Sequence, residues 1–156
     1  MKNNFTKSDI DLVIKFLKTK DIILTQSKNV LKFEKAWSKW LGVKYSVFVN
    51  SGSSANLLSI SILKILNKKK KEVIVPSLTW SSDIYSVIQN NLKPVFVDIN
   101  LQNLSMDLNA VKNKINNNTL AVFITHAQGF NGLTKDFIDF LKKKKIPLVE
   151  DVCESH

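Results

Sequence analysis

Cysteine is nearly absent from this sequence, because Cys153 is the single one among 156 residues. One cysteine cannot form an internal disulfide, which indicates a reducing compartment. No run of about 18 apolar residues is present, so a membrane-spanning helix is not expected. The polar start of the chain, residues 1–9, excludes a basic-then-apolar secretion signal. We therefore expect a cytoplasmic protein without a membrane partner.

Glycine and proline are scarce as well, with 4 and 3 residues, and no linker is rich in them. Internal repeats are missing, and two lysine tracts are the only low-complexity segments, so nothing marks a boundary between domains. A chain of 156 residues has the size of one ordinary domain, and its hydrophobic content of 44% is enough for a core. We therefore expect a folded domain and exclude disorder.

Acidic residues are outnumbered, with 13 Asp and Glu against 23 Lys and Arg and a formal net charge of +10. Such a charge can indicate a nucleic-acid partner, because clustered lysines neutralise phosphates. The two lysine tracts, Lys68–Lys71 and Lys142–Lys145, each lie between a helical run and an apolar strand, without interleaved aromatic residues. Lysine also interacts favourably with the dipole at a helix C-terminus. We interpret both tracts as solvated helix ends and expect no nucleic-acid partner.

The sequence does contain an alternation of apolar strand-like runs and helical segments. Most of the runs are continuously apolar, which is typical of strands buried on both faces, and the segments between them are long enough for crossover helices. The pattern predicts an α/β fold with a mostly parallel sheet flanked by helices in residues 44–156, preceded by two amphipathic helices in residues 1–43. The predicted strands are 45–49, 73–75, 94–97, 120–124 and 147–149, and the predicted helices are 8–17, 30–41, 55–66, 81–89, 108–115 and 135–143.

A turn of small residues, Asn50–Asn56, follows the first core strand and leads into a helical run. The N–H groups of a first helical turn lack partners, and the helix dipole adds positive potential, so such a turn can bind an anion. Gly52 would let the chain pass close to a bound phosphate. The same residues can also cap the helix without any ligand, and the two interpretations stay open at this point.

Chemically capable side chains follow the later predicted strands, where ligands of open α/β sheets gather. Trp80 is suited to stack on a planar ring, or it is a core or interface tryptophan. Asp151 is suited to accept a hydrogen bond from a protonated ring nitrogen, or it forms a helix capping box with Glu154. His126 is expected to be a hydrogen-bonded loop residue, and no metal site is predicted, because no second ligand lies at metal spacing. Cys153 is expected to be a small buried hydrophobe.

A phosphate-binding helix start, a stacking aromatic and an acidic partner for a ring nitrogen are the fixed contacts of a pyridoxal phosphate site. The sequence resembles the DegT/DnrJ/StrS family of fold-type I, pyridoxal-phosphate-dependent nucleotide-sugar aminotransferases over nearly the whole chain. The matching motifs are Phe33-Glu34, Leu41-Gly42-Val43, Asn50–Ala55, Glu72–Ser77 with Thr79-Trp80, Pro94–Asp98, and Glu150-Asp151 with Cys153, Glu154 and His156.

The resemblance implies cofactor contacts for individual residues. Gly52 and Ser53 would hold the cofactor phosphate, and Ser54 would be a second phosphate ligand or only a helix cap. Trp80 would stack on the pyridine ring. The resemblance also implies that residues 1–156 are the N-terminal part of the large domain of a fold-type I enzyme.

Two acidic residues would take part in catalysis if the resemblance holds. Asp151 would pair with the ring nitrogen, and Glu154, at a position that is often Gln in the family, would contact the ring hydroxyl or lie beside the reacting amine. The cofactor would be pyridoxal 5′-phosphate or pyridoxamine 5′-phosphate. The partners would be a nucleotide-linked keto sugar, an amino donor that is usually glutamate, and a second copy of the chain in a homodimer.

The resemblance places the family's Schiff-base lysine and its small C-terminal domain beyond residue 156. We therefore expect a fragment and predict that residues 1–156 alone have no aminotransferase activity. Glu154, Trp80 and the run Gly52–Leu58 also resemble the 4-keto-6-deoxysugar 3-dehydratases, which carry a histidine in place of that lysine and remove the sugar 3-hydroxyl with pyridoxamine phosphate. Transamination is favoured, dehydration is the alternative, and a non-catalytic binding or structural module is the third reading.

Overall fold

The computed structural model describes residues 4–155. The chain divides into two compact units, residues 1–48 and 49–156, five residues later than the expected end of the N-terminal helices. Within the first unit, helix α1 spans Lys7–Leu17 and helix α2 spans Lys28–Leu41. The chain leaves α2 through Gly42, whose φ of 75° lies in the left-handed region that favours glycine.

The predicted strand at residues 45–49 is wrong. This segment is irregular, and no strand in the described part of the chain pairs with it. The backbone N–H of Phe48 donates instead to the Glu34 carboxylate (2.8 Å), and the Phe48 ring packs edge-on against Phe33 of α2 (5.5 Å between centroids). An apolar run becomes a strand only where a neighbouring strand accepts its backbone hydrogen bonds, and here a helix takes up the aromatic side chain instead.

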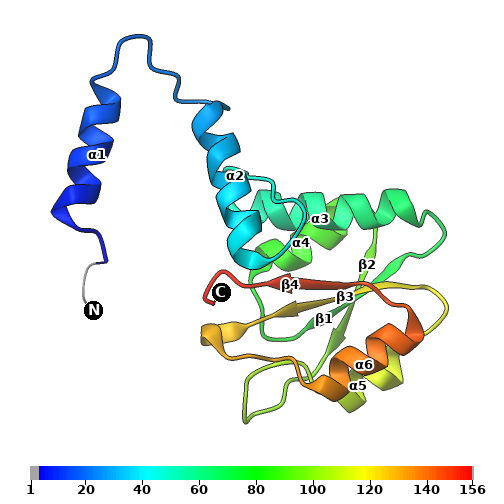
Figure 1. Cartoon of the computed structure of the whole chain (residues 1–156). Coiled ribbons are helices and arrows are strands. Elements are labelled where there is room, and N and C mark those ends of the chain that lie inside the picture. The colour runs from blue at the N-terminus through cyan, green and yellow to red at the C-terminus, as the bar shows by residue number, and fades with distance from the viewer. Residues whose placement is uncertain (1–3, 156) are drawn as a thin grey trace. The chain divides into compact units, whose positions relative to one another are not determined.

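The second unit is a parallel sheet in which the strand order is β2-β1-β3-β4 (Figure 1). This confirms the predicted α/β class, and the remaining predicted strands and helices are present with small shifts at their ends. The elements are α3 Gly52–Leu66, β1 Glu72–Pro76, α4 Ser81–Gln89, β2 Lys93–Val97, α5 Leu108–Lys114, β3 Thr119–Thr125, the 3₁₀ turn η1 Ala127–Gly129, α6 Lys135–Lys144 and β4 Leu148–Asp151.

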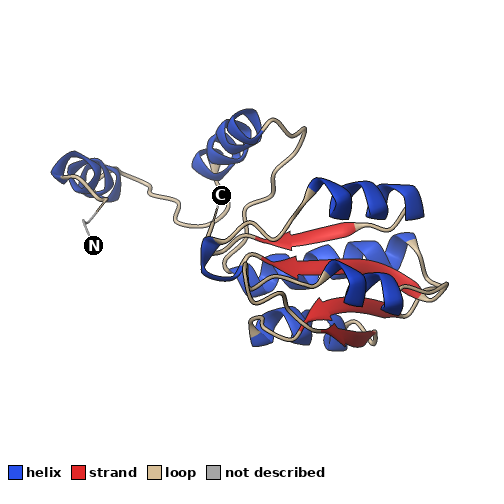
Figure 2. Ribbon diagram, turned by 90° about the horizontal axis from the view of Figure 1, so that it is seen from below, coloured by secondary structure: helices blue, strands red, loops and turns tan. Residues whose placement is uncertain are grey.

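Helices cover both faces of this sheet (Figure 2). Val73, Val75 and Phe123 point to one face and pack in a cluster with residues of α3 and α4. Ile74 and Val122 point to the other face and pack with residues of α5 and α6. Because successive strand residues point to opposite faces, a strand covered on both sides must be apolar at every position, which explains the continuous apolar runs.

The chain order creates a switch point between β1 and β3. The connection from β1 leads outward to β2, whereas that from β3 leads outward in the opposite direction to β4. Ligands of open α/β sheets bind outside the carboxyl ends of the strands at such a point. The lysine tracts lie away from it, because Lys68–Lys71 precede the start of β1 and Lys142–Lys145 close α6.

No helix within residues 4–155 combines the length and the apolar character needed to cross a membrane.

Candidate functional site

The N-terminus of α3 has two backbone donors that remain open. Ser51 caps the helix, since its hydroxyl accepts the N–H of Ser54 (3.1 Å) and its carbonyl accepts the N–H of Ala55 (3.1 Å). The N–H groups of Gly52 and Ser53 have no acceptor in the described part of the chain. A phosphate bound there would satisfy two donors that the fold itself leaves unpaired.

Gly52 is not required by the fold itself. A Cβ built on it would meet no atom within 4 Å, and its φ lies outside the left-handed region. Close approach of a ligand therefore remains as a reason for glycine at this position. The Ser53 side chain is exposed, whereas the Ser54 hydroxyl donates to the Asn50 side chain (2.7 Å). The residue that caps the helix is Ser51, so neither of the two roles expected for Ser54 follows from this contact.

Trp80 lies on the surface beside a pocket at the switch point. Its side chain is 52% exposed, so Trp80 is not a core residue, and it directly precedes α4. The pocket has a volume of about 350 Å³. Its wall comes from the last residue of β3, from the segments that follow β1, β3 and β4, and from one residue of the loop after β2: Leu78, Thr79, Trp80, Leu104, Thr125, Ala127, Gln128 and Glu154. An indole at the rim of such a pocket is placed to stack on a planar ring.

Asp151 is the last residue of β4 and is buried. Its Oδ1 accepts the backbone N–H of Cys153 (2.9 Å), and its Oδ2 accepts from the Asn56 side-chain amide (2.8 Å). Burial by itself disfavours the charged form, but the hydrogen bonds from Asn56 and Cys153 outweigh it and hold the pKa of Asp151 below its usual value. Asp151 is thus an ionised carboxylate near neutral pH.

The capping box considered for Asp151 and Glu154 lacks its reciprocal contact, because the Glu154 carboxylate accepts the backbone N–H of Gln128. The chain forms a turn after Asp151, and residues 152–155 contain no helix. The expected contribution of His156 to this motif lies outside the described residues. The Asp151 carboxylate closes the turn through the N–H of Cys153, which is an Asx-type contact.

Glu154 is held at the rim of the same pocket. Its Oε2 accepts the backbone N–H of Gln128 (2.6 Å), which ties the end of β4 to the turn after β3. That turn is conformationally unusual, because Gln128 has a φ of 56° and Gly129 a φ of 76°. A Cβ on Gly129 would lie 2.7 Å from the Glu154 carbonyl oxygen, so glycine is required there.

Two residues that the sequence did not reveal complete the site. Asn56, on the inner face of α3, donates one N–H to Asp151 and one to Asp83, both at 2.8 Å. Asp83, in the first turn of α4, is 0% exposed. Burial raises the pKa of Asp83 above its usual value; the hydroxyls of Thr79 and Thr125 oppose this shift, and the nearby Asp151 adds to it. The only signal in the sequence is a polar residue on the buried face of each helix.

The remaining polar candidates near β4 are not placed to react. His126 is buried and accepts the Gly132 N–H at Nδ1 (3.2 Å), so its Nε2 carries the hydrogen that faces Glu150 (3.1 Å). It is the hydrogen-bonded loop histidine that was expected. Cys153 is exposed, so the prediction of a buried cysteine is wrong. Partial burial and the neighbouring Asp151 raise the pKa of its thiol, which lowers its reactivity.

Comparison with known proteins identifies relatives over almost the whole chain. Residues 3–156 match the DegT/DnrJ/EryC1/StrS aminotransferase family. GDP-4-keto-6-deoxy-D-mannose 3-dehydratase of Yersinia pseudotuberculosis is 37% identical over 85% of this chain and 35% of its own length. UDP-4-amino-4,6-dideoxy-N-acetyl-beta-L-altrosamine transaminase of Campylobacter jejuni is 34% identical over 97% of this chain and 40% of its own length.

A solved structure has the same fold. The E. coli GDP-4-keto-6-deoxy-D-mannose-3-dehydratase with bound hydrated pyridoxal phosphate superposes with a TM-score of 0.87 at 31% identity, and the match covers 99% of this chain and 40% of that one. The chain therefore spans between a third and two fifths of the length of these relatives.

Proposed function

Since the chain belongs to the DegT/DnrJ/EryC1/StrS aminotransferase family, we propose that it supplies the cofactor-binding part of a pyridoxal-phosphate-dependent enzyme acting on a nucleotide-linked keto sugar. One observation carries the proposal. The buried, ionised Asp151 lies at the end of β4 and is joined through Asn56 to the helix that opens with two unpaired N–H groups. The exposed Trp80 borders the pocket at the neighbouring strand ends.

Each residue has a defined task in this proposal. The N–H groups of Gly52 and Ser53 and the Ser53 hydroxyl bind the phosphate, and the Trp80 indole stacks on the ring. Asp151 accepts a hydrogen bond from the ring N–H, and its negative charge keeps that nitrogen protonated. When bound, the cofactor supplies an electron sink for the carbanion of the substrate. Glu154, anchored on the Gln128 N–H, is placed to accept a hydrogen bond from the ring hydroxyl or the reacting amine.

Transamination is the first candidate reaction. The Campylobacter jejuni relative, a transaminase, aligns over 97% of this chain, and two GDP-perosamine synthases align over 85% of it. We expect glutamate as the amino donor and a homodimer as the working form. Because the relatives are much longer than this chain, we expect no turnover by residues 1–156 alone, and detectable turnover by the purified chain would refute this.

Dehydration at the sugar 3-position is a second candidate. The Yersinia pseudotuberculosis 3-dehydratase is 37% identical, above the transaminase at 34%, and a second 3-dehydratase, from Escherichia coli, is 34% identical. The residues proposed to hold the phosphate, the ring and its nitrogen serve either reaction, so they do not separate the two candidates.

Product analysis separates them. The chain, extended to the full length of the family, is incubated with the cofactor, glutamate and a GDP-linked 4-keto-6-deoxy sugar. Gain of an amino group in the sugar, detected by mass spectrometry, supports the aminotransferase, and loss of the 3-hydroxyl oxygen supports the dehydratase. If neither product forms while the purified enzyme also fails to bind the cofactor, both reactions are refuted and a non-catalytic module remains.

A further inference from the structure

Three oxygen atoms lie in mutual contact beside the buried end of α4. The Thr125 hydroxyl is 2.8 Å from Asp83 Oδ2, and the Thr79 hydroxyl is 2.6 Å from that of Thr125. The Thr79 hydroxyl also hydrogen-bonds Asp83 Oδ2, which closes a triangle. The other carboxyl oxygen, Oδ1, accepts from the Asn56 amide (2.8 Å) and the Ser82 hydroxyl (3.3 Å).

The hydrogens available in this triangle favour an uncharged Asp83. If both threonine hydroxyls donate to Asp83 Oδ2, no hydrogen is left for the 2.6 Å contact between the two hydroxyl oxygens. A hydrogen on the carboxyl group removes this conflict, because one threonine then accepts from Oδ2 and donates to the other threonine. Oδ2 is the carboxyl oxygen inside the triangle, whereas Oδ1 accepts from the Asn56 amide. The cluster is then a ring in which each oxygen donates once and accepts once.

The surroundings of Asp83 favour the uncharged acid. Its side chain is fully buried, and no lysine in the described part of the chain pairs with it. The elements packed against it contribute the neutral Asn56 from α3 and Thr125 from β3. The titratable groups that face it are Asp151 on β4 and, beyond that carboxylate, the Cys153 thiol. The N-terminus of α4 favours a negative charge, but a second buried carboxylate across one amide group opposes it.

We propose that Asp83 is a protonated, hydrogen-bond-donating acid that works with Asn56 as a positioning residue, so that the pair of carboxyl groups carries one negative charge, located on Asp151. The Asn56 amide has two hydrogens and divides them between the two carboxyl groups. Fixing Asp83 in the threonine ring thereby fixes Asn56, and Asn56 in turn fixes Asp151. The charge is kept at the end of β4, where a protonated heterocyclic ring would meet it; this purpose rests on the proposed function, whereas the protonation does not.

Carboxyl titration of the 156-residue chain tests the proposal directly. The ¹³C shift of each aspartate carboxyl carbon is followed by NMR against pH in the wild type, in Asp83→Asn and in the control Asp139→Asn, which removes an exposed carboxylate of the same unit. We expect the wild-type Asp83 to titrate above the ordinary value of about 3.9 and Asp151 below it. A midpoint of Asp83 at or below that of Asp151 would overturn the proposal.

The Asp83→Asn variant adds a second readout in the same spectra. If Asp83 is already uncharged when Asp151 titrates, the substitution leaves the midpoint of Asp151 unchanged. If Asp83 is instead charged at that point, its removal lowers the midpoint of Asp151, and the proposal fails. The Asp139→Asn spectra show how far removal of an unrelated carboxylate moves the same midpoint.

Unfolding in urea against pH gives an independent test. An acid with a raised pKa in the folded state holds a proton that the unfolded chain has lost, so its contribution to stability falls as pH rises above the unfolded pKa. The wild type should therefore lose stability relative to Asp83→Asn as pH rises from the unfolded pKa of about 3.9 through the raised folded pKa of Asp83. A pH-independent difference, or one of opposite sign, would contradict a protonated Asp83. Neither readout needs a bound cofactor, so a failure of cofactor binding would refute the proposed function without touching this result.

Discussion

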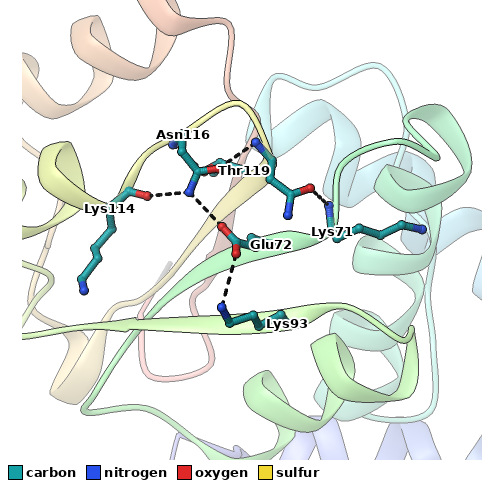
Figure 3. Close-up of polar contacts among 7 residues, drawn as sticks. Lys71, Glu72, Lys93, Lys114, Asn116 and Thr119 are labelled. Carbon is teal, nitrogen blue, oxygen red and sulfur yellow. Dashed lines mark hydrogen bonds and ion pairs between the residues drawn. The ribbon is translucent and has the colours of Figure 1, made fainter.

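Carboxyl groups at the amino ends and at the carboxyl ends of the strands have different kinds of partners. We call these two sides of the sheet its amino edge and its carboxyl edge. At the start of β1, Glu72 accepts a hydrogen bond from the Asn116 amide (2.9 Å) and pairs with Lys93 (3.4 Å) (Figure 3). Near the ends of the strands, Asp83 and Asp151 both accept from the neutral amide of Asn56 and also act on each other, and neither has a cationic partner among residues 4–155.

The difference shows at which edge the chain itself supplies a cation for the carboxylate. The hydrogen bond from Asn116, and to a smaller extent Lys93, lower the pKa of Glu72 against the effect of burial, so its charge is balanced locally. The charge of Asp151 is stabilised by hydrogen bonds from the Asn56 amide and the Cys153 N–H, which lower its pKa, and no cation among residues 4–155 pairs with it. A protonated ring nitrogen bound beside it would supply the missing positive charge, which is the physical core of the proposed site.

Loss of the Asp151 charge should have the largest effect. In the enzyme extended to family length, Asp151→Asn should reduce turnover to near zero, roughly 10²- to 10³-fold or more, because the ring nitrogen loses the carboxylate that keeps it protonated. The fold should be kept, as measured by circular dichroism. Glu72→Gln, at the opposite edge, is the matched control and should leave turnover unchanged. If Asp151→Asn remains active, the assigned role of Asp151 is wrong.

Removal of the Asn56 amide, which donates to both Asp83 and Asp151, should have the second largest effect. Asn56→Leu keeps the approximate side-chain volume but leaves two buried carboxyl groups without their common donor, which should cost about 1–3 kcal/mol in the free energy of unfolding. The pKa of Asp151 should rise, because the Asn56 hydrogen bond lowers it. Urea unfolding and carboxyl NMR measure the two effects. Asn116→Leu serves as the control, and an equal loss of stability in both variants would remove the distinction between the edges.

Trp80 should contribute to affinity and little to stability. Its side chain is half exposed, so Trp80→Ala should leave the fold intact and weaken binding of pyridoxamine 5′-phosphate by on the order of 1 kcal/mol or more. Isothermal titration calorimetry measures the change. Tyr85→Ala, which removes an exposed aromatic side chain from α4, is the control. Unchanged affinity in Trp80→Ala would refute the stacking role.

The smallest effect is expected for Glu72, at the start of β1. Glu72→Gln should cost about 0–1 kcal/mol at pH 7, because the lysine of the ion pair is exposed and glutamine can still accept from Asn116. Because the folded-state pKa of Glu72 is lowered, its contribution is present above the unfolded pKa and is lost as pH falls through the folded value. Urea unfolding of both proteins should therefore converge on acidification. A difference that grows at low pH would contradict this assignment.

The sequence predicted the sheet better than the network inside it. Continuous apolar runs such as Leu120–Ile124 indicated strands covered on both faces, and the small-residue turn at Gly52 indicated a helix start with open donors. The segment 45–49 failed because its apolar residues do not reveal whether a partner strand exists. The roles of Asn56 and Asp83 were not predicted. Asn56 is 27 residues from Asp83 and 95 residues from Asp151 in the sequence, and the three side chains meet only in the folded domain. The spacing of Asp151 and Glu154 also did not reveal that the Glu154 carboxylate accepts from Gln128, which lies in the turn after β3.

Binding of pyridoxamine 5′-phosphate to the ¹⁵N-labelled 156-residue chain tests the central claim most directly. We predict saturable chemical-shift changes at the backbone amides of Gly52 and Ser53 and at the Trp80 indole, absent with pyridoxamine that lacks the phosphate and weaker in Asp151→Asn. Inorganic phosphate controls for charge attraction to the lysine tracts. Changes confined to those tracts, or none at the start of α3 and at Trp80, would contradict a cofactor site at the carboxyl edge of the sheet.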